Sequence, residues 1–167
     1  MSIRRLLSGI VLILAVGCHG TDTGILEDSD TCEVQNTWKK AFSSKGEVVV
    51  RTLKDKRVYW TAKQVGPMTW EEADRYCKGL ALEGRKWRLP KKSEGLGLLN
   101  PSCQTHDDCY LPQEISGCKP FWTATVQEIS YKNKAKYKEA YIVDPVFGGG
   151  GFDYLTETHW VLCFSKD

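Results

Sequence analysis

Thr69-Trp70-Glu71-Glu72-Ala73-Asp74-Arg75-Tyr76-Cys77 is the stretch of the chain with the strongest local structural signal. It begins with a capping box, in which the Thr69 hydroxyl caps the third amide of a helix and Glu72 reaches back to the start of it. Apolar residues then recur at helical spacing, and Gly84 ends that pattern. We therefore expect one amphipathic helix over residues 70–83, with Cys77 on its buried face.

Short β-strands are expected on both sides of this helix along the chain. Runs rich in β-favouring residues and bounded by polar turns or glycines occur at residues 47–51, 57–62, 121–131, 136–143 and 159–164. Residues 84–120 hold four of the 6 prolines and three cysteines, which predicts long loops pinned by disulfides. The glycines at residues 148–151 lack the Gly-Lys-Ser/Thr ending of a phosphate-binding loop, so we expect a flexible hairpin tip there. The sequence thus predicts an α+β fold, with one main helix packed on small antiparallel sheets.

The N-terminus resembles the signal peptide of a bacterial lipoprotein. Arg4 and Arg5 precede an apolar run that is shorter than the roughly 20 residues needed to span a bilayer but suits a signal peptide. Ala15-Val16-Gly17-Cys18 then resembles a lipobox, with small residues before a cysteine. We expect a signal peptide over residues 1–17 and acylation of Cys18, which would anchor the chain in the bacterial cell envelope, at the outer membrane. An ordinary signal peptide with a later cleavage site is the alternative.

The segment after the lipobox is expected to tether a single domain. Residues 18–31 are polar and acidic, which is typical of a flexible spacer. Residues 32–167 are enough for one domain with its own core. The chain has 23 basic and 21 acidic residues, and this near-neutral balance does not predict a nucleic-acid partner. A composition with 41% hydrophobic and 26% charged residues is typical of a globular domain and argues against disorder.

The cysteines indicate a disulfide framework. The chain has 7 of them, and lipid on Cys18 would leave an even number for disulfides. No CxxC pair occurs and the histidines are scattered, so metal ligation explains the cysteines less well than oxidation does.

Five sequence signals occur in an order that resembles a known bacterial family. They are residues 69–77, Trp87-Arg88-Leu89-Pro90 with Glu94, residues 121–125, residues 140–144 and residues 161–163. Over residues 46–164 the chain resembles the C-terminal domain family of the Legionella collagen-like adhesin. That family is similar in fold to C-type lectins and to formylglycine-generating enzymes. The resemblance therefore implies a C-type lectin-like fold.

The resemblance also implies a disulfide between the helix and the last strand, which transfers to Cys77 and Cys163. For the remaining cysteines we expect the pairs Cys103–Cys109 and Cys32–Cys118, and Cys109–Cys118 is the competing pair.

The motif residues are expected to form the core rather than a ligand-facing surface, because large apolar groups stabilise a fold when buried. Arg88 is expected to pair with Glu94, the nearest carboxylate, since buried charges are normally paired. The full set is Trp70, Trp87, Arg88, Leu89, Pro90, Glu94 and Trp122, joined by Trp160.

Catalytic and metal-binding patterns are weak in this sequence. The Glu-Pro-Asn or Gln-Pro-Asp and Trp-Asn-Asp tripeptides of calcium-binding C-type lectins are replaced by Asn100-Pro101-Ser102, Leu111-Pro112-Gln113 and Trp160-Val161-Leu162. His106-Asp107-Asp108 is the nearest metal-like cluster, and a disulfide-pinned polar loop explains it better. Neither a Ser-His-Asp order nor a pair of catalytic carboxylates stands out. We expect no enzyme activity, no metal and no cofactor.

A lysine-rich hairpin is the candidate ligand-binding surface. Its residues are Lys132, Lys134, Lys136 and Lys138, beside Tyr131 and Tyr137. Clustered cations attract polyanionic glycans and aromatic rings contact sugar faces, whereas a solvated hairpin tip is the alternative explanation. We therefore expect a non-catalytic, lipid-anchored binding or adhesion module. The alternatives are a structural envelope lipoprotein that contacts other proteins and, more remotely, an enzyme related to the formylglycine-generating group.

Overall fold

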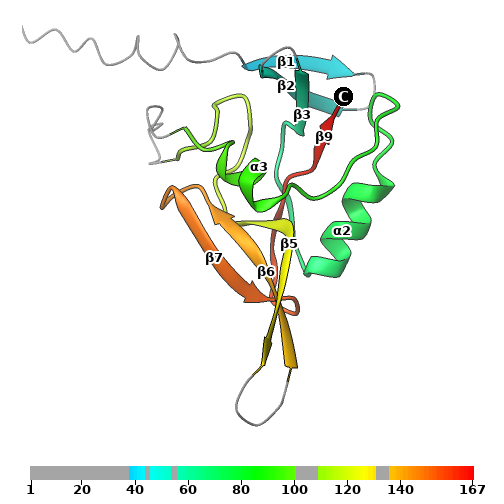
Figure 1. Ribbon diagram of the computed structural model, residues 1–167. Coiled ribbons are helices and arrows are strands. Elements are labelled where there is room, and N and C mark those ends of the chain that lie inside the picture. The colour runs from blue at the N-terminus through cyan, green and yellow to red at the C-terminus, as the bar shows by residue number, and fades with distance from the viewer. Residues whose placement is uncertain (1–37, 44–45, 54–55, 101–108, 131–135) are drawn as a thin grey trace, which may run out of the picture.

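The computed structural model of the protein describes residues 38–43, 46–53, 56–100, 109–130 and 136–167 (Figure 1). In this part of the chain it is mostly β-sheet, with two small sheets and two short helices. None of the described helices has the length and apolar character needed to cross a membrane.

The first sheet has the strand order β1-β2-β3-β9, and each neighbouring pair is antiparallel. Its strands are β1 (Trp38–Ser43), β2 (Gly46–Leu53), β3 (Lys56–Thr61) and β9 (Phe164–Lys166). Valine and aromatic residues favour the extended backbone in β2 and β3, as the sequence predicted for residues 47–51 and 57–62. The last strand of the chain lies beside β3, so segments that are far apart in sequence share this sheet.

The second sheet has the order β4-β8-β5-β6-β7, in which only the β8–β5 pair is parallel. Its strands are β4 (Val65–Met68), β8 (His159–Val161), β5 (Phe121–Ser130), β6 (Lys136–Asp144) and β7 (Gly149–Tyr154). The strands β5 and β6 form the predicted hairpin, which projects beyond the rest of the sheet (Figure 1).

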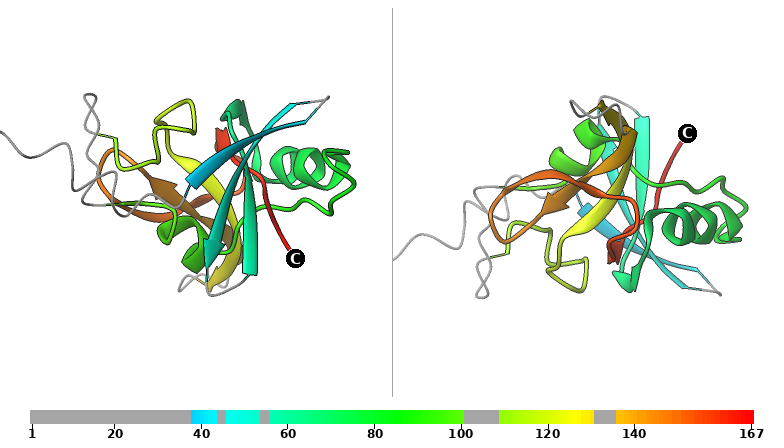
Figure 2. Two further views of the ribbon diagram at one scale, coloured as in Figure 1. Left: turned by 90° about the horizontal axis from the view of Figure 1, so that it is seen from above. Right: turned by 90° about the horizontal axis from the view of Figure 1, so that it is seen from below.

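The predicted helix is present as α2 (Trp70–Gly79). The Glu72 carboxylate accepts hydrogen bonds from the Thr69 amide at 2.9 Å and from the Thr69 hydroxyl at 2.8 Å. Cys77 is buried, as expected, but the helix ends four residues before the predicted boundary because Leu80 has an extended backbone. The views from above and below place α2 on the opposite side of the molecule from β7 (Figure 2).

A second short helix, α3 (Lys92–Leu96), lies in the region expected to be a long loop. It packs on β5 and β6, and Gly95 makes this close approach possible. A Cβ at this position would lie only 2.9 Å from a methyl group of Val143. The helix is too short to show helical periodicity, so the sequence pattern did not predict it.

The core consists of two clusters of buried residues that lie on either side of β3 and the C-terminal segment. Trp60 and Phe164 belong to one cluster, whereas Tyr59 and Cys163 belong to the other. This division follows from the alternation of side chains along an extended chain. Both faces of these segments are therefore buried, and they join the two sheets.

The expectation of one final strand over residues 159–164 is wrong. The structure divides this segment into β8, in the second sheet, and β9, in the first. Cys163, between the two strands, is fully buried; its carbonyl accepts from the Thr61 amide at 3.0 Å and its amide donates to the Thr61 hydroxyl at 3.1 Å. The chain changes sheets here because these bonds hold Cys163 against the end of β3.

Two disulfides lie within the described residues. Cys77 is joined to Cys163, the pairing that the resemblance implied. Cys109 is joined to Cys118, so the expected pairs Cys103–Cys109 and Cys32–Cys118 are wrong. The chain turns back at residues 112–115 and brings the Cα atoms of this second pair within 6.0 Å. Cys32 and Cys103 themselves lie outside the described residues.

Only Gly148 of the glycine run lies in a turn, so the expected hairpin tip over residues 148–151 is wrong for the other three glycines. Gly149 and Gly150 instead begin strand β7, and the turn is at residues 145–148. Gly150 is needed within the strand because β6 approaches it closely. A Cβ at this position would overlap the carbonyl oxygen of Ile142. Glycine is the residue that permits a neighbouring backbone to come this near.

Replacing Gly150 with Ala should therefore destabilise the domain by about 1–3 kcal/mol, the usual range for overpacking. Gly151→Ala is the matched control, since its Cβ would meet no atom within 4 Å. Urea unfolding of both variants checks this prediction. Equal stability of the two would contradict the observed register of β6 and β7.

Candidate functional site

The Trp87-Arg88-Leu89-Pro90 motif forms part of the core, as the sequence predicted. Arg88 makes a two-pronged ion pair with Glu94, at 2.8 Å from Nη1 to Oε2 and 2.7 Å from Nη2 to Oε1. The backbone of Arg88 also exchanges two hydrogen bonds with Phe164, at 3.1 and 2.8 Å. Trp87 and Leu89 are buried, and so is Pro90. The motif thus ties the start of α3 to β9.

The carboxylate of Glu94 is held in its charged form. Burial would raise the pKa of this carboxyl, but hydrogen bonds from Arg88 and from the Lys91 amide, together with the nearby charges of Arg88 and Lys166, lower it below its ordinary value. A carboxylate that accepts several hydrogen bonds is stabilised in this way.

The tryptophans of the family motifs are likewise structural. The indole nitrogens of Trp70, Trp87 and Trp122 donate to backbone carbonyls, at 2.9, 3.0 and 2.8 Å respectively. Trp160 is half-buried and packs against one of the core clusters. These contacts support the prediction that the tryptophans build the core.

The lysine-rich hairpin is only partly described. Lys132, Lys134 and Tyr131 lie outside the described residues, whereas Lys136 and Lys138 are exposed on β6. Lys136 forms an ion pair with Glu128 at 2.8 Å, which lowers the pKa of Glu128 and raises that of Lys136. In the strand register, Glu128 lies directly opposite Lys138. The carboxylate therefore offsets part of the positive charge at this end of the hairpin.

Tyr137, expected beside the lysines in the hairpin, lies on the other face of the strand. Successive side chains of a strand point to opposite faces, so Lys136 and Lys138 lie on one face of β6 and Tyr137 lies on the other. The ring of Tyr137 instead contacts that of Tyr154 on β7, with a distance of 6.1 Å between ring centres.

A row of aromatic rings follows this second face of β6 and β7. The rings of Tyr141 and Phe152 lie 5.1 Å apart, and Lys92 of α3 places its ammonium group 4.1 Å from the centre of the Tyr141 ring. Tyr141 is buried, but Tyr137, Phe152 and Tyr154 are 44%, 38% and 40% exposed. Three rings are therefore available to solvent on one face. Phe152 and Tyr154 were not predicted as site residues, although their alternation in Gly151-Phe152-Asp153-Tyr154 is typical of a strand.

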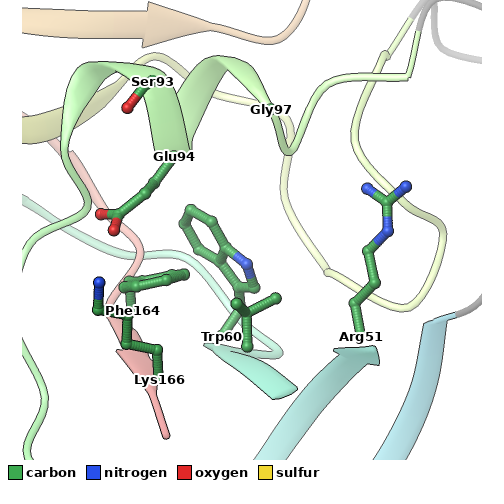
Figure 3. A pocket seen from close by; sticks show the side chains of 8 residues that line it. Arg51, Trp60, Ser93, Glu94, Gly97, Phe164 and Lys166 are labelled. Carbon is green, nitrogen blue, oxygen red and sulfur yellow. The ribbon is translucent and has the colours of Figure 1, made fainter. Parts of the chain in front are cut away.

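A cavity of about 250 Å³ lies between α3 and one face of the first sheet (Figure 3). Its walls include aromatic, aliphatic and charged side chains: Arg51, Val58, Trp60, Ser93, Glu94, Gly97, Phe164 and Lys166. Sequence reasoning did not find this cavity, because its residues come from four separate segments of the chain.

Other chemistry is sparse in the described part of the chain. No three His, Cys, Asp or Glu side chains are grouped there as a metal site would require. His159 contacts Asp153 at 2.8 Å and packs edge-on against Trp122, with ring centres 4.5 Å apart. This contact connects β8 to β7. His106, Asp107 and Asp108, which were expected to form a disulfide-pinned polar loop rather than a metal site, lie outside the described residues.

The family comparison gives one match. The family model described as the Lcl C-terminal domain matches residues 38–164, which is most of the chain and includes every strand and helix described above except the last two residues of β9. A search of curated proteins finds no match.

Proposed function

Because this chain belongs to the Lcl C-terminal domain family, we propose that it is a non-catalytic binding module of the bacterial cell envelope that recognises polyanionic glycans. The observation that carries this proposal is the row of exposed rings formed by Tyr137, Phe152 and Tyr154. Rings of this kind stack on the apolar faces of sugars.

The lysines of the same hairpin supply the charge for this function. Lys136 and Lys138 lie on the face opposite the rings, and Lys132 and Lys134 continue the alternating sequence pattern. A polyanionic chain that crosses the narrow hairpin would meet rings on one face and ammonium groups on the other. Such exposed charges act over about one Debye length, roughly 8 Å in physiological salt, and binding should therefore depend on salt.

The architecture supports a C-type lectin-like domain as the scaffold for this surface. The features in favour are two small sheets, the helix α2 on one side, and a disulfide from α2 to the segment that precedes the last strand. The calcium tripeptides of C-type lectins are absent from the sequence, so binding is proposed to be independent of calcium.

The proposed location rests on the N-terminal sequence. A signal peptide over residues 1–17, a lipid on Cys18 and a polar tether over residues 18–31 would hold the domain at the envelope membrane, expected to be the outer membrane. Several acyl chains on one residue supply a firm anchor, since each buried methylene contributes about 0.8 kcal/mol.

Heparin chromatography at low and at physiological ionic strength tests the proposed function. We expect the wild type to be retained at low salt and to elute early at physiological salt, because screening weakens exposed charges. One variant changes the four hairpin lysines to Ser, and a second changes the three exposed rings to Ser. Both should lose most of the retention. The lysine variant should keep the wild-type circular dichroism spectrum, since exposed charges contribute little to stability, and the spectrum of the ring variant checks that its fold is retained.

The matched control changes four exposed lysines elsewhere to Ser, which removes the same formal charge. These are Lys63, Lys78, Lys86 and Lys119. If retention falls equally in the control and in the hairpin lysine variant, binding depends only on the net charge of the protein and not on the hairpin. Full retention of both hairpin variants, or loss of wild-type binding with a calcium chelator, would overturn the proposal.

A further inference from the structure

A lysine of α3 lies on the ring face, which is the face of β6 and β7 that carries Tyr137, Tyr141, Phe152 and Tyr154. The ammonium group of Lys92 is 4.1 Å from the centre of the Tyr141 ring and 5.8 Å from that of the Phe152 ring. A cation within about 6 Å of a ring centre is attracted by the ring. The positive charge is therefore held at the same place as the rings, unlike the charges of the hairpin lysines on the opposite face.

The backbone of Lys92 is fixed in this position by hydrogen bonds. Its amide donates to the Thr125 hydroxyl on β5 at 2.9 Å. The preceding amide, that of Lys91, donates to the Glu94 carboxylate at 2.7 Å and closes the first turn of α3. Because α3 is held against the second sheet, only the side chain of Lys92 has to be ordered when a ligand binds, which lowers the cost of binding.

The charge of Lys92 is not offset by an ion pair. The ion pairs between described residues involve other cationic side chains, and no carboxylate of the described residues lies within 4.0 Å of the Lys92 ammonium. The aromatic faces attract this cation without neutralising it, and an ammonium group has three N–H donors. The side chain is also partly exposed, so an anionic group can reach it from solvent.

The ring face also has an acidic position between its rings. Glu139 lies between Tyr137 and Tyr141 on β6 and is opposite Tyr154 in the strand register. Its carboxylate accepts a hydrogen bond from Gln127 on β5 at 3.1 Å. Two residues of a strand cover roughly 7 Å, which separates the rung of Glu139 from that of Tyr141. Sugar hydroxyls can donate to this carboxylate, whereas it would repel an acidic group.

We propose that the ring face binds a sugar of the uronic-acid class in one orientation, with the sugar carboxylate bound by Lys92. The acidic sugar stacks on Phe152, and the neighbouring neutral sugar lies over Tyr154 beside Glu139. The carboxylate of a uronic acid is bonded directly to the sugar ring, so it stays beside the aromatic ring on which that sugar stacks. This inference rests on the proposed function and deepens it, because it makes Lys92 the residue that selects the acidic sugar.

NMR titration of the purified full-length protein with cellobiouronate, a glucuronate joined to a glucose, tests this inference. The uronamide of the same disaccharide keeps the shape without the charge. In physiological salt we expect saturable shifts of the backbone amides of Phe152 and Tyr154. The acid should bind about tenfold more tightly than the amide, because hydrogen bonds between charged groups are about twice as strong as neutral ones.

Three variants locate the charge that matters. Lys92→Met keeps a long apolar side chain over the rings, and it should weaken binding of the acid about tenfold, as expected for loss of a hydrogen bond to a charged group. Binding of the amide should stay within about twofold, so the preference for the acid is lost. Lys92→Arg, which keeps the charge, should retain most of the preference.

Lys78→Met is the matched control, since it also removes one positive charge. Lys78 lies on α2, on the opposite side of the molecule from β7 (Figure 2), so its charge is screened from the ring face and the preference for the acid should stay.

The outcomes separate this inference from the proposed function. Equal affinity of the wild type for the acid and the amide would overturn the inference, and this comparison needs no variant to fold. A Lys92→Met protein that keeps the preference, or equal losses in Lys92→Met and Lys78→Met, would also overturn it. If heparin is still retained by the wild type and lost by the two hairpin variants in those cases, the proposed function stands without Lys92. A wild type that heparin does not retain would instead contradict the proposed function.

Discussion

Replacing Cys77 and Cys163 together with Ala should lower the free energy of unfolding by about 4–5 kcal/mol. The disulfide joins residues 86 apart in sequence, and the chain-entropy model assigns this stabilisation to closing so long a loop in the unfolded state. Both cysteines are fully buried between α2 and the segment that connects the two sheets. Small domains have unfolding free energies of only about 5–15 kcal/mol, so much of the stability is expected to be lost.

The second disulfide provides the control for this prediction. Cys109 and Cys118 are only 9 residues apart, and the same model gives about 2.5–3 kcal/mol for closing so short a loop. Urea unfolding of the two double variants under non-reducing conditions measures both effects. A smaller loss for the Cys77 and Cys163 variant than for the Cys109 and Cys118 variant would contradict the assignment of the long disulfide as the main covalent stabiliser.

Replacing Trp122 with Ala should destabilise the domain by about 3–5 kcal/mol, the usual cost of deleting a large buried aromatic side chain. Trp122 lies on β5 and is 0% exposed. Its indole nitrogen donates to the carbonyl of Met68 on β4 at 2.8 Å, and its ring packs against His159 on β8. The side chain therefore connects three neighbouring strands of the second sheet.

Two milder variants of the same strand test this explanation. Trp122→Phe keeps most of the buried ring but leaves the Met68 carbonyl without its donor, so we expect a smaller loss of about 1–3 kcal/mol. Val126→Ala changes a residue that is 39% exposed and should stay within about 0.5 kcal/mol of the wild type. Chemical unfolding monitored by near-ultraviolet circular dichroism measures all three. A Trp122→Ala protein as stable as Val126→Ala would contradict the role assigned to this side chain.

The sequence predicted those elements whose causes lie within a few residues of each other. The capping box at Thr69 and the apolar residues that follow at helical spacing predicted the start of α2 and the burial of Cys77. Runs of β-favouring residues predicted the hairpin of β5 and β6. The ion pair between Arg88 and Glu94 also followed from proximity along the chain. The end of α2 was missed because the backbone becomes extended at Leu80, four residues before Gly84.

Several expectations failed where the outcome depended on a neighbour from elsewhere in the chain. The glycines at residues 148–151 were expected to form a hairpin tip, but Gly150 is part of β7, where β6 approaches it closely. The elements β4 and α3 have only 4 and 5 residues, too few to show a clear period, so they were not predicted. Strand β1 was not predicted either, because its sequence Trp38-Lys39-Lys40-Ala41-Phe42-Ser43 does not alternate between apolar and polar residues. The predicted partner of Cys118, Cys32, was wrong because cysteine spacing alone does not determine which cysteines form a disulfide.

By itself, the amino-acid sequence determined the family, the main helix, the central hairpin and the residues of the Arg88–Glu94 pair, because each of these rests on patterns that are local or occur in a fixed order. Only the tertiary structure decided which side chains share a surface. Alternation along β6 puts Tyr137 on the face opposite the lysines. Strand register then brought Tyr137 beside Tyr154, and it placed Arg51 and Lys166, which are far apart in the sequence, on one rung next to that of Trp60. A register shift of one residue would move each of these side chains to the other face of its sheet, and no single segment of sequence contains the information that sets the register.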